Sequence, residues 1–106
     1  MIFIKLFLDG IIVTGHANFK KKGEDIVCSA VSAIIQGFIK SFDDSLINEH
    51  IENPKIPLIY FRTTSEISKE SMNILVTQLK CILNSAKNYL NLEITNNLIK
   101  GIIYEK

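Results

Sequence analysis

A length of 106 residues suits a single domain, and we expect residues 1–106 to fold as one unit without metal or disulfide cross-links. The formal net charge is only +1, which gives no electrostatic reason to expect a nucleic-acid or membrane-surface binder. The two cysteines, Cys28 and Cys81, have neither the pattern of a disulfide framework nor that of a zinc site. These totals favour a globular protein of the reducing cytoplasm.

The first ten residues are apolar, but they do not have the pattern of a targeting segment. They lack a basic start, Lys5 and Asp9 interrupt them, and no small-residue cleavage site follows. No apolar run approaches the roughly 18 residues of a membrane-spanning helix. We therefore expect neither a signal peptide nor a transmembrane segment.

The N-terminal region predicts a β-hairpin. Residues 2–8 and 11–16 are rich in Ile, Phe and Val, and the dipeptide Asp9-Gly10 between them is a strong hairpin signal. Residues 17–24 contain a lysine run and a glycine but no apolar period, so we expect a loop there.

Two later segments have apolar residues at steps of three and four, which predicts two helices. The first begins after Asp25, a good N-cap residue, and ends near Lys40. The second begins at Ser65 or Ser68 and continues to Leu90. The apolar residues of the first helix are Ile26, Val27, Ala30, Val31, Ile34, Ile35 and Phe38.

Shorter β-prone segments complete the expected sheet. They are residues 46–51, 56–62 and 91–95, with a further terminal strand over 98–104 left open. The resulting order ββαββαβ places the helices between antiparallel pairs. It predicts an α+β fold, a two-layer sandwich of a mainly antiparallel sheet and two helices.

Cys28 is the position where the sequence most favours chemistry. With Asp25 as N-cap, Cys28 is the third helical residue, and the free N–H groups and dipole of the first turn favour a thiolate there. The same N–H groups are suited to hold the oxyanion of a tetrahedral intermediate. The alternative is that Cys28 is a small buried hydrophobic residue, which is common for a free cysteine.

His16 is the candidate base for this thiol. It follows Gly15 at the end of the second strand, and the chain then leads directly into the Cys28 helix. A strand end and the next helix start are often neighbours, so His16 is a candidate to accept the thiol proton. The alternative is a surface or capping histidine.

These residues resemble the Prp family, the ribosomal-processing cysteine peptidases of bacteria. The resemblance rests on Gly15-His16-Ala17, a short loop ending in Gly23, and the segment 25–32, which reads Asp-Ile-Val-Cys-Ser-Ala-Val-Ser. The family's motif is Gly-His-Ala, a glycine-containing loop, and Asp-Ile-Val-Cys followed by small residues and a serine. The separation of histidine and cysteine also matches, and a fainter similarity extends over nearly the whole chain.

The resemblance implies a cysteine endopeptidase that removes a short N-terminal extension from large-subunit ribosomal protein number twenty-seven. Family members cut after an aromatic pair and before an alanine. The resemblance also implies Cys28 as nucleophile, His16 as proton donor and acceptor, no cofactor and no metal. It further implies a mobile loop between these two residues and a homodimer, with the N-terminal peptide of the ribosomal protein as partner.

Three further positions are candidates for lining the site: Gly15, Ala17 and Ser32. Ser32 lies one turn beyond Cys28 on the same face of the expected helix, although helical serines often bond back to the preceding turn. Asp25 matches the family's aspartate and is a candidate to orient the histidine. A role as N-cap is favoured for it, because a capping carboxylate is already committed to backbone N–H groups.

One departure from the family is the run Lys20-Lys21-Lys22, which leaves the substrate preference open. We expect Cys81 to fill the core and His50 to have no functional role. A metal site built from the two cysteines and two histidines has no ligand spacing to support it.

Two other functions are compatible with the same residues. One is a non-catalytic dimeric module that binds ribosomal proteins, in which Cys28 has ordinary reactivity. The other is a thiol redox sensor. The absence of a resolving cysteine close in sequence weighs against this function.

Overall fold

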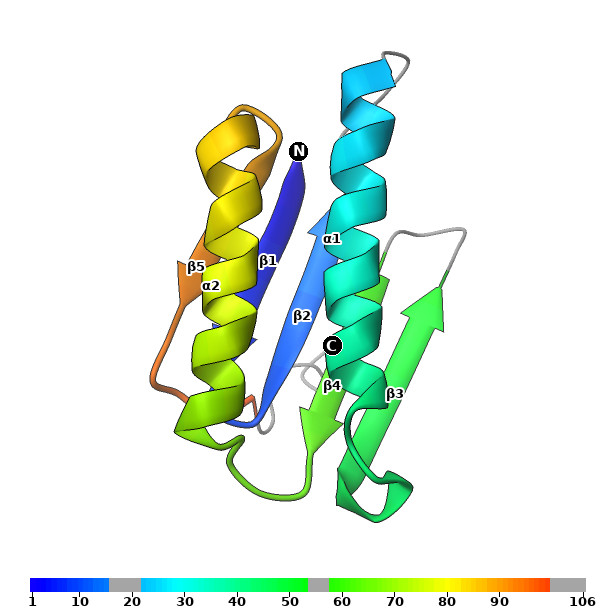
Figure 1. The fold of residues 1–106 in the computed structure, drawn as a ribbon. Coiled ribbons are helices and arrows are strands. Elements are labelled where there is room, and N and C mark those ends of the chain that lie inside the picture. The colour runs from blue at the N-terminus through cyan, green and yellow to red at the C-terminus, as the bar shows by residue number, and fades with distance from the viewer. Residues whose placement is uncertain (16–21, 54–57, 100–106) are drawn as a thin grey trace.

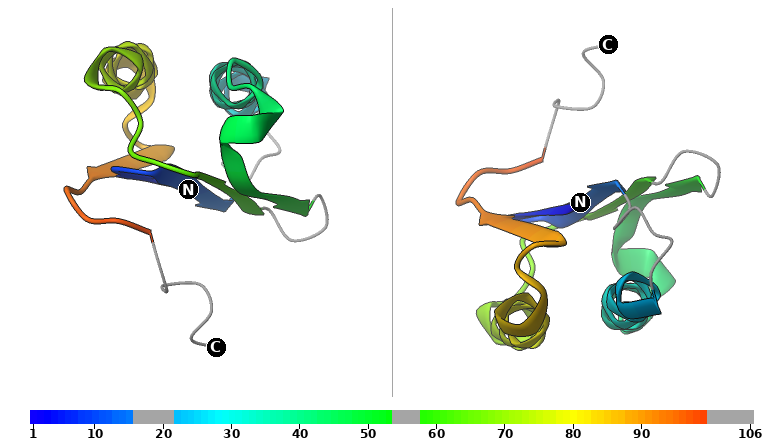
Figure 2. Two further views of the ribbon diagram at one scale, coloured as in Figure 1. Left: turned by 90° about the horizontal axis from the view of Figure 1, so that it is seen from below. Right: turned by 90° about the horizontal axis from the view of Figure 1, so that it is seen from above.

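The elements follow the predicted order. The computed structural model describes residues 1–15, 22–53 and 58–99, with the backbone alone for 22–25. Within these residues, two helices lie on one face of a five-stranded sheet (Figures 1 and 2). The elements are β1 (Ile2–Phe7), β2 (Gly10–Gly15), α1 (Lys22–Lys40), the short 3₁₀ helix η1 (Asp44–Leu46), β3 (Ile47–Asn53), β4 (Leu58–Thr63), α2 (Lys69–Ala86) and β5 (Leu90–Ile94). The predicted α+β order ββαββαβ is confirmed.

The strands are arranged in the order β3-β4-β2-β1-β5. All neighbouring pairs are antiparallel except β1 and β5, which are parallel. The helices α1 and α2 both cover the same face, and residues 97–99 of the chain pass over the other (Figure 2). No helix in the described part of the chain is long and apolar enough to cross a membrane.

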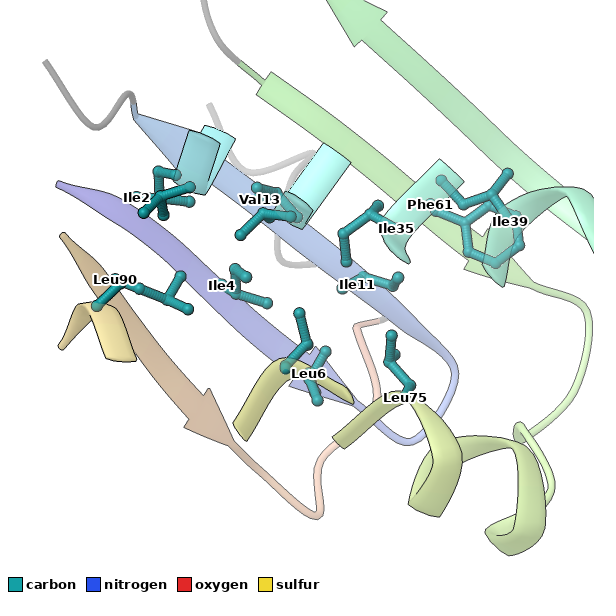
Figure 3. Close-up of a cluster of buried hydrophobic side chains, with 14 residues drawn as sticks. Ile2, Ile4, Leu6, Ile11, Val13, Ile35, Ile39, Phe61, Leu75 and Leu90 are labelled. Carbon is teal, nitrogen blue, oxygen red and sulfur yellow. The ribbon is translucent and has the colours of Figure 1, made fainter. Parts of the chain in front are cut away.

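The core forms where the inward residues of the strands meet one row of each helix. Val27, Val31, Ile35 and Ile39 recur at steps of four along α1 and are all buried. From the sheet they meet Ile2, Ile4, Leu6, Ile11, Val13, Phe61 and Leu90, and from α2 they meet Leu75, Leu79 and Ala86 (Figure 3). Each such large aliphatic side chain contributes about 1.5–3 kcal/mol by burial. Ile26, which the expected apolar stripe included, is instead 68% exposed.

The hairpin turn lies one residue earlier than predicted. Phe7 pairs with Gly10, so the two-residue loop is Leu8-Asp9 rather than Asp9-Gly10. The glycine is required inside β2 for a tertiary reason, because a Cβ at Gly10 would collide with the backbone carbonyl of Phe61 in β4.

Asp9 is a buried structural residue. Its backbone carbonyl accepts a hydrogen bond from the N–H of Thr63 at 2.8 Å. Its Oδ1 accepts one from the N–H of Ile99 at 2.7 Å, and its Oδ2 lies 3.4 Å from Nε of Arg62. Ile99 is thereby held on the helix-free face, where it is buried against Phe7 and Tyr60.

The ends of several elements differ from the prediction. The helix α1 begins at Lys22, so Asp25 lies inside it and the predicted N-cap is wrong. Acidic residue types are favourable both at an N-cap and throughout the first turn, so they do not define the start of a helix. For α2, the structure selects Ser68 as N-cap, because its side chain accepts a bond from the N–H of Ser71 at 3.2 Å. This helix ends at Ala86 instead of Leu90.

The strands β3, β4 and β5 match the predicted segments with small shifts at their ends. Of the optional terminal strand, Leu98 and Ile99 are not in a strand, and residues 100–104 lie outside the described residues.

Replacing Asp9 is expected to destabilise the fold. The substitution Asp9→Ala leaves the N–H of Ile99 without its acceptor and removes the nearer of the two carboxylates beside Arg62, the other being that of Glu49. We therefore expect a loss of about 2–4 kcal/mol of unfolding free energy. Urea denaturation measures it. The control is Glu93→Ala, whose carboxylate lies 3.6 Å from Lys5 with both side chains largely exposed, and it should cost under about 1 kcal/mol. Equal losses in the two variants would contradict the structural role of Asp9.

Candidate active site

Cys28 lies in the second turn of α1, not in the first. The helix begins six residues earlier, at Lys22, so Cys28 lies about 9 Å along the axis from its start. The free N–H groups lie in the first turn, and the effect of the helix dipole declines beyond it. The predicted activation of this thiol by the helix terminus is therefore not supported, and the thiol needs another partner.

The surroundings of Cys28 are partly open to solvent. Its thiol is free and half-buried, and it packs against the edge of the main core cluster. Ser32 and Gln36 follow it at steps of four, so the three residues form one row along α1. This row lies next to the buried row that begins at Val27, and we call it the Cys28 row.

Gly15 is the last residue of β2, as the sequence indicated. Its φ is +86°, in the left-handed region that favours glycine, and a Cβ here would collide with the carbonyl of Met1. Two of the predicted site residues, His16 and Ala17, lie outside the described residues, as does the side chain of Asp25. The structure therefore leaves the predicted Cys28–His16 pair untested.

A pocket of about 380 Å³ adjoins the Cys28 row. Both Gly15 and Ser32 line it, so the structure brings these two predicted site residues together, and Cys28 is one turn of α1 from Ser32. The pocket lies between α1 and the strands β2, β3 and β4, and its other lining residues are Val13, Gln36, Glu52, Asn53, Leu58 and Ile59.

The pocket contains a polar network that the sequence analysis missed. Nε2 of Gln36 donates to both carboxylate oxygens of Glu52, at 2.9 and 2.8 Å. Nε2 of His50 lies 2.6 Å from Oε2 of the same carboxylate. His50, for which no role was expected, therefore belongs to this network.

A β-bulge explains why the network was not found from the sequence. The register of β3 against β4 shifts between Ile47 and Glu49. In a regular strand, the spacing of five between Ile47 and Glu52 would place their side chains on opposite faces of the sheet. The extra residue of the bulge places both on the helix-covered face, where Ile47 packs against the core and Glu52 bonds to Gln36 of α1. The only signal in the sequence was the spacing of two between His50 and Glu52, which places them on one face.

Opposing effects act on the pKa of Glu52. Partial burial raises it, but hydrogen bonds from Gln36 and His50 lower it, as does the positive charge of His50 and Lys40. The net effect is a pKa below the ordinary value, because the lowering contributions together outweigh desolvation. The pocket therefore carries a fixed negative charge at neutral pH.

Other cavities lie away from the Cys28 row. A larger, mainly apolar pocket of about 490 Å³ lies between α1 and α2. Cys81 is exposed on α2 and lines a separate apolar pocket with Ile26, so its predicted place in the core is wrong. The buried row of α2 includes Leu79, and a residue two positions later points to a different side of the helix. Among the described side chains, no three His, Cys, Asp or Glu residues gather as metal ligands would.

The chain is similar to known proteins over most of its length. The family model described as cysteine protease Prp matches residues 1–94. The ribosomal processing cysteine protease Prp of Mycoplasma genitalium is 35% identical over 92 residues, which cover 85% of this chain and 92% of that protein. The protein of the same name from Mycoplasma pneumoniae is 34% identical over 82 residues, which cover 76% of this chain and 81% of the relative.

Solved structures share the fold. The ribosomal processing protease Prp of S. aureus, in complex with a covalently linked product peptide, superposes with a TM-score of 0.73 at 18% identity. The match covers 90% of this chain and 100% of that one. The same protease with a substrate peptide gives a TM-score of 0.71 at 15% identity, with the same coverage. From the family model and the two curated relatives, the chain belongs to the Prp family and is a cysteine-type peptidase.

Proposed function

We propose that the chain is an endopeptidase that removes the N-terminal extension of large-subunit ribosomal protein number twenty-seven, with Cys28 as nucleophile and His16 as proton acceptor and donor. The observation that carries the proposal is the place of Cys28: a free, half-buried thiol in a row that continues into a pocket reaching Gly15. The names of the two Mycoplasma relatives supply the ribosomal substrate class.

In the proposed reaction, His16 takes the proton of the Cys28 thiol, and the thiolate sulfur attacks the scissile carbonyl carbon. The C–N bond then breaks, and the imidazolium gives its proton to the leaving amine. A thioester remains until water, deprotonated by the same imidazole, attacks it and frees the acid and the thiol.

The proposed role of His16 follows from the position of Cys28 in α1, which does not let the helix start stabilise the thiolate. Cys28 is too far from the start of the helix for the free N–H groups to stabilise its thiolate. We therefore expect a neighbouring imidazole to accept the thiol proton and, once protonated, to stabilise the thiolate. Gly15 turns the chain at the pocket edge through a left-handed backbone conformation, and His16 is the next residue. This continuity supports the assignment of His16 as the base.

Cleavage is expected to depend on Cys28 and His16. For a peptide that carries an aromatic pair followed by alanine, Cys28→Ala should reduce turnover to background, because no nucleophile remains. His16→Ala should reduce kcat by about 10²-fold or more, because proton transfer is lost. Product formation followed by chromatography measures both variants.

The matched control is Cys81→Ala, which removes the exposed thiol of α2 and should keep full turnover. Circular dichroism and the urea midpoint show whether each variant is folded. Turnover by a folded Cys28→Ala chain would end the proposal.

The two cysteines are expected to differ in their alkylation by iodoacetamide. At neutral pH, His16→Ala should slow the alkylation of Cys28 by about tenfold or more, because a neighbouring imidazolium favours the thiolate. The same substitution should leave the alkylation rate of Cys81 unchanged. Mass spectrometry of the labelled peptides resolves the two sites. An unchanged rate at Cys28 in the folded variant would favour the non-catalytic module.

The proposal includes a homodimer that acts in the cytoplasm. Large apolar side chains on the helix-free face of the sheet support self-association, with Phe3 51% and Ile51 45% exposed. Light scattering is expected to give twice the mass of one chain at micromolar concentration, and Phe3→Ser should lower the dimer fraction if this face is buried. A monomer at all concentrations would contradict the assembly without affecting the proposed chemistry.

A further inference from the structure

The pocket beside the Cys28 row contains a carboxylate that is held in a fixed position. Glu52 is anchored from α1 by Gln36 and within β3 by His50. A carboxylate has roughly four lone-pair sites for hydrogen bonds, and these three contacts leave about one of them. The free site is available to a donor that enters the pocket from solvent, since the side chain of Glu52 is 36% exposed.

The charge of this carboxylate is retained in the folded protein. The groups that act on it are His50 on its own strand and Lys40 and Gln36 on α1, and their combined effect keeps Glu52 ionised at neutral pH. The nearest carboxylate along β3, that of Glu49, bonds to Tyr60 on the other face of the sheet. Glu52 is thus the one charged residue among the described residues that line the pocket.

The separation of Glu52 from Cys28 gives the distance from the scissile bond at which Glu52 would contact a substrate. Gln36, which holds the carboxylate, is eight residues beyond Cys28 on the same row, or about 12 Å along the helix axis. An extended peptide advances about 3.3 Å per residue. A substrate that lies along the row would therefore reach Glu52 with a side chain about three or four residues from the scissile bond.

We propose that Glu52 is a specificity-determining residue that binds a cationic side chain of the substrate, Lys or Arg, about three or four residues from the scissile bond. This inference rests on the proposed function, because it takes Cys28 as the point of cleavage. The pocket volume of about 380 Å³ suits one long side chain and part of the peptide backbone. A charge-assisted hydrogen bond to the fixed carboxylate provides the preference.

The test is a set of cleavable peptides in which Lys, Gln or Glu replaces one residue at a time, at positions two to five on each side of the scissile bond. We expect kcat/KM for Lys to exceed that for Glu by about tenfold at one position three or four residues away, with Gln between them. The variant Glu52→Gln should reduce this ratio to below about twofold, and Glu52→Lys should invert it.

The matched control is Glu49→Gln, the same change on the same strand but on the opposite face, which should leave the ratio unchanged. The same peptides are also bound to the Cys28→Ala chain and followed by fluorescence anisotropy. This binding measurement tests the preference for Lys even if no peptide is cleaved. A lack of cleavage would count against the proposed function but not against the proposed role of Glu52. The inference is overturned if neither measurement prefers Lys to Glu at any position, or if the preference survives in a folded Glu52→Gln chain.

Discussion

The rotation of α1 about its own axis determines which way the residues of the Cys28 row face. Four buried side chains at steps of four, from Val27 to Ile39, press this helix onto the sheet. Successive residues of a helix are about 100° apart, so fixing one row fixes the direction of the next. The neighbouring row, Cys28 with Ser32 and Gln36, is thereby turned to the strands β2, β3 and β4 instead of to α2. The chemistry of this peptidase is thus oriented by its hydrophobic core.

Carboxylates have different roles on the two faces of the sheet. Asp9 is almost fully buried, and its oxygens hold the backbone of other segments, so it acts as part of the scaffold. Glu52 is held by hydrogen bonds to Gln36 and His50, but it stays open to solvent beside the Cys28 row. An anchored group that keeps a free acceptor is suited to recognition, because little conformational freedom is lost when a ligand binds it.

The sequence predicted the parts of the fold that depend on local pattern. The order of elements follows from apolar periods, and the structure confirms it. Of the two serines predicted to open α2, Ser65 and Ser68, the structure selects Ser68. The turn at Leu8-Asp9 was missed because Gly10 is needed for the close approach of β4, which the local sequence does not reveal. Asp25 was taken as a cap because acidic residues suit several positions at a helix start.

The site was predictable only in part for similar reasons. Gly15 and Ser32 were found from the motif, and the structure brings them together in one pocket. Glu52 was not found, because a bulge in β3 changes which residues face α1 and the partner in α1 is far away in the sequence. Contacts between distant segments leave no periodic signal, whereas a motif or an apolar row does.

The parallel pairing of β1 with β5 has a consequence for how the chain folds. β1 and β5, the first and last strands of the described residues, are adjacent in the sheet, with Ile2 beside Leu90, although nearly the whole described sequence separates them. Contacts of such long range form slowly, because a large loop must close before they contribute. During synthesis, β1 therefore has an unpaired edge until β5 emerges, and this exposed backbone is available for pairing with another chain.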